Sequence, residues 1–143
     1  MPEINEHNRD LFTHLSPEEQ ERLYIAATDL FSENKRNLFD RLVQNRTRHI
    51  AVALEDVFQS HNASAVLRSC DCFGVQDVHV VENRNHYAPN SEVSMGSDKW
   101  VDYYKYPSTL ECYDQLRKKG YKIIATLPHE NDTMITDLDV SQP

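Results

Sequence analysis

Glycine is scarce in this sequence, and its placement excludes the commonest nucleotide-binding loops. The chain has 143 residues and three glycines. None of them (Gly74, Gly96 and Gly120) lies between the first predicted strand, residues 50–54, and the helix that follows it. A dinucleotide-binding turn or a phosphate-binding loop needs glycine there, because the backbone must approach the phosphates closely. The sequence therefore carries neither motif.

Cysteines and long apolar segments are also few. An odd number of cysteines, three, gives no disulfide framework, and Cys70 and Cys72 lie two apart in a predicted helix, where their side chains diverge. No apolar run approaches the length of about 20 residues that a transmembrane helix needs. The polar, acidic segment 1–10 is unlike a signal or transit peptide. We expect a reduced, cytoplasmic globular protein with no membrane partner.

The charge is unevenly distributed. The net charge of −8 argues against nucleic-acid binding, because phosphate binding requires lysine and arginine. However, residues 1–34 hold eight acidic and two basic side chains, whereas residues 35–49 hold five basic side chains and one acidic one. A basic segment of this kind is compatible with an RNA-facing surface and equally with a solvated helix face. The candidate RNA-binding residues in this segment are Arg41, Arg46 and Arg48.

The N-terminal part of the chain predicts two helices. Ser16, Pro17 and Glu19 form a capping-box pattern with a first-turn proline, and apolar residues follow at helical spacing. A second amphipathic helix is predicted from about Ser32. We assign residues 1–48 to an N-terminal helical extension.

From His49 onward the pattern alternates between strands and helices. The predicted strands are residues 50–54, 78–81 and 121–127. The predicted helices are residues 62–73, closed by Gly74, and residues 108–119, which begin with a second capping box and end at Gly120. This order is typical of an α/β fold with a parallel sheet and crossover helices. We assign residues 49–143 to that domain.

The first strand leads into a polar segment that could hold a ligand. In open α/β sheets, ligands bind beyond the carboxyl ends of the strands, which places Asn62 at the binding edge, at or near the N-cap of the next helix. Arg68 follows six residues later, and an arginine near a helix N-terminus is suited to a phosphate group. The alternative is an asparagine cap and an unrelated surface arginine.

Three segments in order resemble the SpoU/TrmH family of RNA methyltransferases. The first is His-Asn-Ala-Ser-Ala-Val-Leu-Arg-Ser at residues 61–69, followed by Phe-Gly-Val at residues 73–75. The second is Ser-Met-Gly-Ser-Asp-Lys-Trp-Val at residues 94–101, which is similar to the tRNA branch of the family. The third is Lys-Ile-Ile-Ala-Thr at residues 122–126. The resemblance extends over residues 49–143.

The resemblance implies a fold, a reaction and a set of site residues. It implies a knotted α/β methyltransferase that works as a homodimer with S-adenosylmethionine and methylates a ribose 2′-hydroxyl in RNA, in particular that of guanosine-18 in the D-loop of tRNA. It assigns catalysis to Asn62 and Arg68, with Arg68 also touching RNA, and cofactor contacts to Thr126 and Leu127. The alternative is a non-catalytic RNA-binding or dimerisation module of the same fold.

The chemistry leaves two roles open for Arg68. The family assigns its arginine to the ribose hydroxyl proton, but a guanidinium stays protonated near neutral pH and is a poor general base. Anchoring a neighbouring phosphate and stabilising oxyanion charge is the physically easier role.

Three further expectations concern the rest of the sequence. The family motifs that form the knot and close the cofactor pocket are absent, so residues 1–143 alone are expected to bind S-adenosylmethionine weakly or not at all. The histidines and cysteines show no metal-ligand spacing, which predicts no metal site. Four aromatic residues fit a core or dimer contact better than a base-stacking surface; they are Trp100, Tyr103, Tyr104 and Tyr106.

Overall fold

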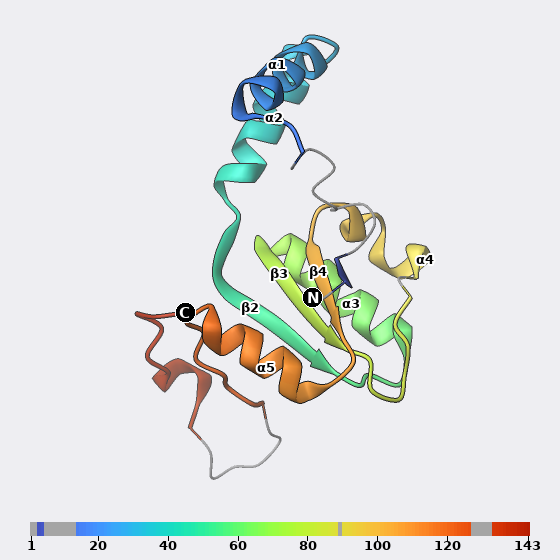
Figure 1. Cartoon of the computed structure of the whole chain (residues 1–143), viewed down its shortest axis with the longest axis vertical. Helices are drawn as coiled ribbons and strands as arrows, with labels where there is room; N and C mark the ends of the chain where they lie inside the picture. Colours follow the sequence, from blue (N-terminus) through green and yellow to red (C-terminus); the bar gives the residue numbers. More distant parts are fainter. Residues whose placement is uncertain (1–2, 5–13, 89, 127–132) are drawn as a thin grey trace.

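The computed structural model of the chain describes residues 3–4, 14–88, 90–126 and 133–143. Its centre is a four-stranded sheet in the order β1-β4-β3-β2 (Figure 1). Three strands run parallel, and β1 pairs antiparallel with β4. The strands are β1 (Glu3–Ile4), β2 (Thr47–Glu55), β3 (Val75–Val81) and β4 (Asp102–Tyr106). The predicted parallel α/β fold with crossover helices is confirmed.

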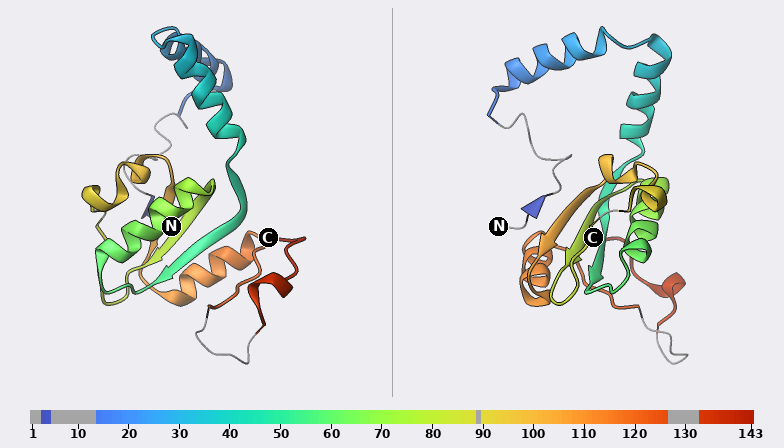
Figure 2. Two further views of the ribbon diagram at one scale, coloured as in Figure 1. Left: turned by 180° about the vertical axis from the view of Figure 1, so that it is seen from behind. Right: turned by 90° about the vertical axis from the view of Figure 1, so that its right-hand side faces the viewer.

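Helices cover both faces of the sheet. Figure 2 shows α3 (Ser60–Cys72) on one face and α5 (Thr109–Lys118) on the other. A hydrophobic core lies on each face of the sheet, one under α3 and one under α5. Alternate residues of β3 contribute to these two cores, because successive side chains of a strand point to opposite faces. Val78 and Val80 pack with Leu67 of α3, whereas Val81 packs with the α5 side. Short helices, α4 (Ser91–Ser94) and two 3₁₀ turns (Ser97–Lys99 and Ile135–Asp137), complete the described elements.

The two N-terminal helices project from the sheet (Figure 1). These are α1 (Pro17–Thr28) and α2 (Glu33–Gln44), and neither contains a buried residue. The predicted capping box at the start of α1 is confirmed: Glu19 N donates to Ser16 Oγ, and Ser16 N donates to the Glu19 carboxylate at 2.8 Å. Ser32 is the N-cap residue of α2, as predicted.

Gly74 occupies a position that no other residue could take without distortion. It closes α3 in the left-handed region at φ +74°, and an added Cβ would lie 2.3 Å from the carbonyl oxygen of Asn45. The close approach lets Thr47 N donate to Gly74 O at 2.8 Å, which aligns the start of β2 with the start of β3.

The region between β3 and α5 holds a strand that is not among the predicted ones. It contains β4, whose aromatic residues suit a strand that is covered on both faces. Tyr103 is buried toward α3, and Tyr106 is buried toward α5. The interpretation of these tyrosines as core residues is therefore confirmed, whereas Trp100 remains half exposed.

The predicted strand at residues 121–127 is wrong for the part that the structure describes. Residues 121–126 have no regular secondary structure. Tyr121 N donates to Leu116 O at 3.1 Å, the Tyr121 hydroxyl donates to Arg48 O, and Lys122 N donates to Pro143 O at 2.8 Å. These bonds hold the segment beside β2, but without the ladder that would make it a strand. Only Tyr121 and Ile123 are partly buried against the core beside α5, and the other residues of the segment are exposed.

Candidate active site at the carboxyl edge of the sheet

The loop after β2 is held in shape by Asp56. This residue lies in the left-handed region at φ +48°, which aspartate tolerates better than most residues. Its carboxylate Oδ1 accepts hydrogen bonds from the backbone N–H groups of Arg84 and Asn85 at 2.7 and 2.8 Å. These two bonds lower the pKa of the Asp56 carboxyl. The loop after β2 is thus joined to the loop after β3.

Asn62 lies in the first turn of α3, on the solvent side of the carboxyl edge. The N-cap residue is Gln59, so the expectation that Asn62 sits at or near the N-cap is corrected by one turn. Asn62 N donates to Gln59 O at 3.0 Å, and the Asn62 side-chain amide donates to Gln59 Oε1 at 3.5 Å. Asn62 is exposed. The amide is therefore available to a ligand that approaches the start of the helix.

Arg68 is exposed on the same helix, six residues beyond Asn62. Six helical residues correspond to a rise of about 9 Å and a turn of about 240°, so the two side chains do not meet directly. Ala65, which is also exposed, lies between them on the solvent face. The arrangement allows one extended ligand, such as a nucleotide with its flanking phosphate, to contact both side chains across that face.

Two further acidic side chains at the carboxyl edge, Glu55 and Glu82, have partners. Thr109 Oγ1 donates to Glu55 Oε1 at 2.6 Å, which joins the end of β2 to the start of α5. Lys105 Nζ and Tyr87 N both lie 2.8 Å from Glu82 Oε1. Burial raises the pKa of the Glu82 carboxyl, but these contacts outweigh it and leave the pKa lowered. Because these carboxylates are paired, this edge repels an anion less than its acidic sequence indicates.

Thr126 lies on a groove between the open edge of β2 and residues 121–126. The groove has a volume of about 580 Å³ and includes Leu54, Val66 and Tyr113 in its lining. Thr126 itself is exposed, and Leu127, the other predicted cofactor residue, lies outside the described residues. A cofactor site normally surrounds most of its ligand. The lining of this groove comes from β2, α3, α5 and residues 121–126.

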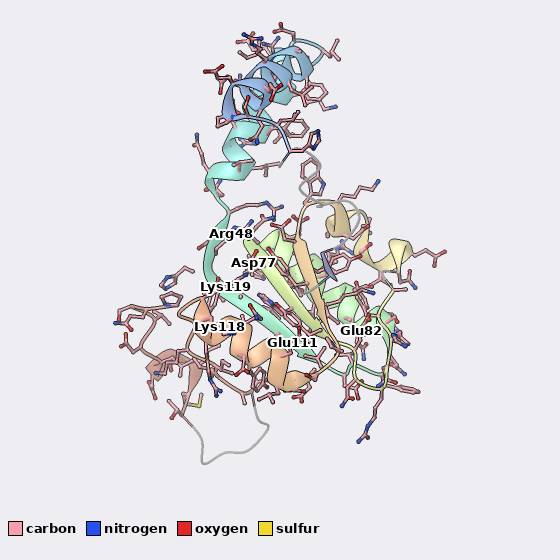
Figure 3. The ribbon with its side chains drawn as sticks, in the orientation of Figure 1. Arg48, Asp77, Glu82, Glu111, Lys118 and Lys119 are labelled. Atoms are coloured by element: carbon pink, nitrogen blue, oxygen red, sulfur yellow. The ribbon has the colours of Figure 1, made fainter. Side chains whose placement is uncertain are left out.

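The basic segment lies at the opposite end of the sheet. Figure 3 shows Arg48 next to Asp77 at the amino ends of the strands and Glu82 at the carboxyl end. Arg48 pairs with the buried carboxylate of Asp77 and, at 2.6 Å, with Asp102. Arg46 pairs with Asp71, and its side chain is only 18% exposed. Both arginines thus have protein partners that account for their positions without RNA.

Arg41 differs from these two arginines. It is exposed in the last turn of α2, and its guanidinium makes no hydrogen bond or ion pair with any residue that the structure describes. Of the three residues singled out in the basic segment, Arg41 is the one whose charge is free for an external phosphate.

The described part of the chain contains no group of three or more histidine, cysteine or acidic side chains that could hold a metal ion. Within the same residues, no helix is long and apolar enough to cross a membrane.

Comparison with known proteins places this site in a family. Residues 49–143 match the family model described as the SpoU rRNA Methylase family. A tRNA (guanosine(18)-2′-O)-methyltransferase of Borreliella burgdorferi is 33% identical over 110 residues, covering 77% of this chain and 50% of that protein. The enzyme of the same name from Thermus thermophilus is 31% identical over 112 residues, covering 78% and 58%. The chain spans about half the length of these curated relatives.

A solved structure agrees with the sequence matches. The crystal structure of the Aquifex aeolicus TrmH/SpoU tRNA modifying enzyme superimposes with a TM-score of 0.63 at 25% identity, covering 76% of this chain and 57% of that one. The family match extends over the strands, helices and loops that position Asn62 and Arg68. The chain therefore belongs to the SpoU methylase family.

Proposed function

We propose that the full-length protein transfers a methyl group from S-adenosylmethionine to a ribose 2′-oxygen in tRNA, at guanosine-18 of the D-loop. The proposal rests on family membership and on relatives whose names specify this reaction. The structural observation in its support is that Asn62, at the carboxyl edge, and Arg68, about 9 Å further along α3, are both exposed. Such an edge is the usual ligand position in an open α/β sheet.

In this proposal the two side chains have different roles. Arg68 holds a phosphate next to the reacting ribose and stabilises the negative charge that develops on the 2′-oxygen, since a guanidinium binds oxyanions through paired N–H groups. Asn62 orients the nucleotide through its amide at the start of the helix. The stability of α3 does not require either side chain, because the buried face of the helix is formed by other residues (Ala63, Ser64, Leu67 and Cys70).

The cofactor and the assembly are also proposals. S-adenosylmethionine supplies the methyl group, and we propose that Thr126 and Leu127 contact it beside the edge of β2. We further propose a cytoplasmic homodimer, with residues 1–48 as a helical extension and residues 49–143 as part of the methyltransferase domain.

A methyl-transfer assay tests the proposal. Full-length protein, unmodified tRNA and S-adenosylmethionine with a labelled methyl group are expected to give labelled tRNA, with 2′-O-methylguanosine at position 18 on nuclease mapping. Methylation of a base, or label at another ribose, would contradict the assigned position. RNA binding without transfer would instead favour the non-catalytic module.

The basic segment gives a separate prediction for RNA binding. Arg41→Gln is expected to reduce the slope of log K against log salt by about one unit, because one phosphate contact is lost. Arg48→Gln is expected to lower stability by roughly 1–3 kcal/mol with little change in slope, because it leaves the buried Asp77 carboxylate without its arginine. RNA titrations at several salt concentrations and thermal melts measure the two effects. A slope that falls for Arg48→Gln and not for Arg41→Gln would reverse the assignment.

A further inference from the structure

The segment between β3 and α4 is tied to the protein at several points along its path. Near its middle, Tyr87 N donates to Glu82 Oε1 at 2.8 Å, and Lys105 Nζ donates to Tyr87 O at 2.8 Å. Next to α4, Asn90 N donates to Ser64 Oγ at 3.0 Å. The segment therefore has one defined course over its described residues, 82–88 and 90.

Asp56 makes the attachment nearest to β3, at Arg84 and Asn85. In addition to the two amide bonds to its carboxylate, Asp56 O accepts from Asn85 Nδ2 at 3.1 Å, and Asp56 N donates to Val81 O at 3.0 Å. One residue thus fixes the backbone of Arg84 and Asn85 through bonds from its side chain and its main chain. The sequence motifs do not single out Asp56, although an aspartate directly after a strand is a common loop-forming residue.

This course carries the segment past the start of α3. Asp56 lies six residues before Asn62, and Ser64 lies two residues after it. Ser64 is fully buried, and its hydroxyl also lies 3.3 Å from the Tyr87 hydroxyl. Ser64 and Asn62 belong to the same turn of α3 but point in directions about 200° apart, so the segment packs against the buried side of the turn whose exposed side presents Asn62.

Arg84 is the basic residue that this arrangement brings to the edge. Its side chain is exposed, and its guanidinium makes no hydrogen bond or ion pair within the described part of the chain. Its charge contributes, after the amide bonds, to the lowered pKa of Asp56. By contrast, the ammonium of Lys105 is already paired with Glu82. Arg84 thus offers an available positive charge beside the proposed reaction site.

We propose that Arg84 contacts a phosphate of the substrate RNA next to the methylated nucleotide, and that Asp56 is the positioning residue that holds Arg84 there. The inference rests on the proposed function for the identity of the ligand. A fixed backbone reduces the conformational entropy lost when the arginine binds, which is why a clamped loop is better suited to this task than a free one.

The test compares two arginines and two substitutions of Asp56 in the full-length protein. Arg84→Gln is expected to raise KM for tRNA several-fold and to lower the salt slope by about one unit, with KM for S-adenosylmethionine and the melting temperature unchanged. Arg117→Gln is the matched control, because Arg117 is exposed in the last turn of α5, on the other face of the sheet. Asp56→Ala is expected to raise KM for tRNA and to accelerate amide hydrogen exchange at Arg84 and Asn85. Asp56→Asn is expected to restore the wild-type KM and the wild-type exchange rates, because the asparagine oxygen can accept the same two hydrogen bonds.

Each other outcome has a distinct meaning. An Arg84→Gln protein that binds tRNA like Arg117→Gln would overturn the contact. If Arg84→Gln instead raises KM for S-adenosylmethionine, Arg84 contacts an anionic group of the cofactor, and the RNA contact is overturned. If the wild-type protein binds tRNA without methylating it, the proposed function fails, and the salt slopes still decide the Arg84 contact. If it binds no RNA, both proposals fail.

Discussion

Arg68→Ala in the full-length protein is expected to abolish methyl transfer while the fold remains intact. Loss of a group that stabilises a developing oxyanion typically costs a factor of about 100 to 1,000 in kcat. The fold should persist because Arg68 is exposed and makes no hydrogen bond or ion pair with a described residue. Single-turnover methyl transfer measures the chemical step, and a thermal melt measures the fold.

Two companion variants separate the possible roles of Arg68. Arg68→Lys keeps the charge but loses the paired N–H groups, so it should restore tRNA affinity more than the rate of transfer. Ser69→Ala is a neighbouring control on the same face, where the hydroxyl only donates to Ala65 O at 3.0 Å. Near-native transfer by purified Arg68→Ala would show that the arginine has no catalytic role.

The free energy of unfolding is expected to fall by about 3 kcal/mol as the pH is lowered from 6.5 toward 4, owing to His79. Its side chain is buried in β3, with Nδ1 2.8 Å from the Tyr106 hydroxyl and the ring stacked on Tyr104 at 5.0 Å. Burial, and then the charge of Lys119, lower the pKa of His79 from 6.5 to about 4. The remaining ring nitrogen, Nε2, is buried and has no hydrogen-bond partner among the described residues.

The direction of the effect follows from proton binding. Between pH 4 and pH 6.5 the unfolded chain binds a proton at His79 that the folded protein excludes, so stability rises with pH in this window by about 1.4 kcal/mol per unit. The contribution of the uncharged His79 to the free energy of unfolding is fully present above pH 6.5. Carboxyls with lowered pKa values, such as Asp56 and Glu82, add their own loss only at the acidic end of the window.

Chemical denaturation at several pH values tests this prediction. His79→Gln should remove most of the pH dependence between 4.5 and 6.5, even though the variant is less stable at neutral pH. His14→Gln is the matched control, because His14 is exposed. Parallel stability curves for wild type and His79→Gln would show that the imidazole is not the group responsible.

Local signals in the sequence determined most elements of this fold. The Ser16 and Ser108 caps act over three residues, since each hydroxyl accepts a backbone N–H within its own helix, and such contacts can be recognised from spacing alone. The strand–helix–strand order of β2, α3 and β3 followed from apolar periodicity and from Gly74. The first family motif identified Asn62 and Arg68, because both residues belong to one continuous segment.

Only the tertiary structure decided which charges are free and which apolar segments become strands. Arg48 meets Asp102 across 54 residues, and Asp56 meets Arg84 across 28, so no local pattern distinguishes the paired arginine from the available one. Residues 102–106 became a strand because β3 offered a hydrogen-bonding edge. Residues 121–126, although richer in apolar side chains, lie beside β2 without forming a ladder. Helix caps depend on nearby residues, whereas strand pairing and charge neutralisation depend on partners that only the folded chain brings together.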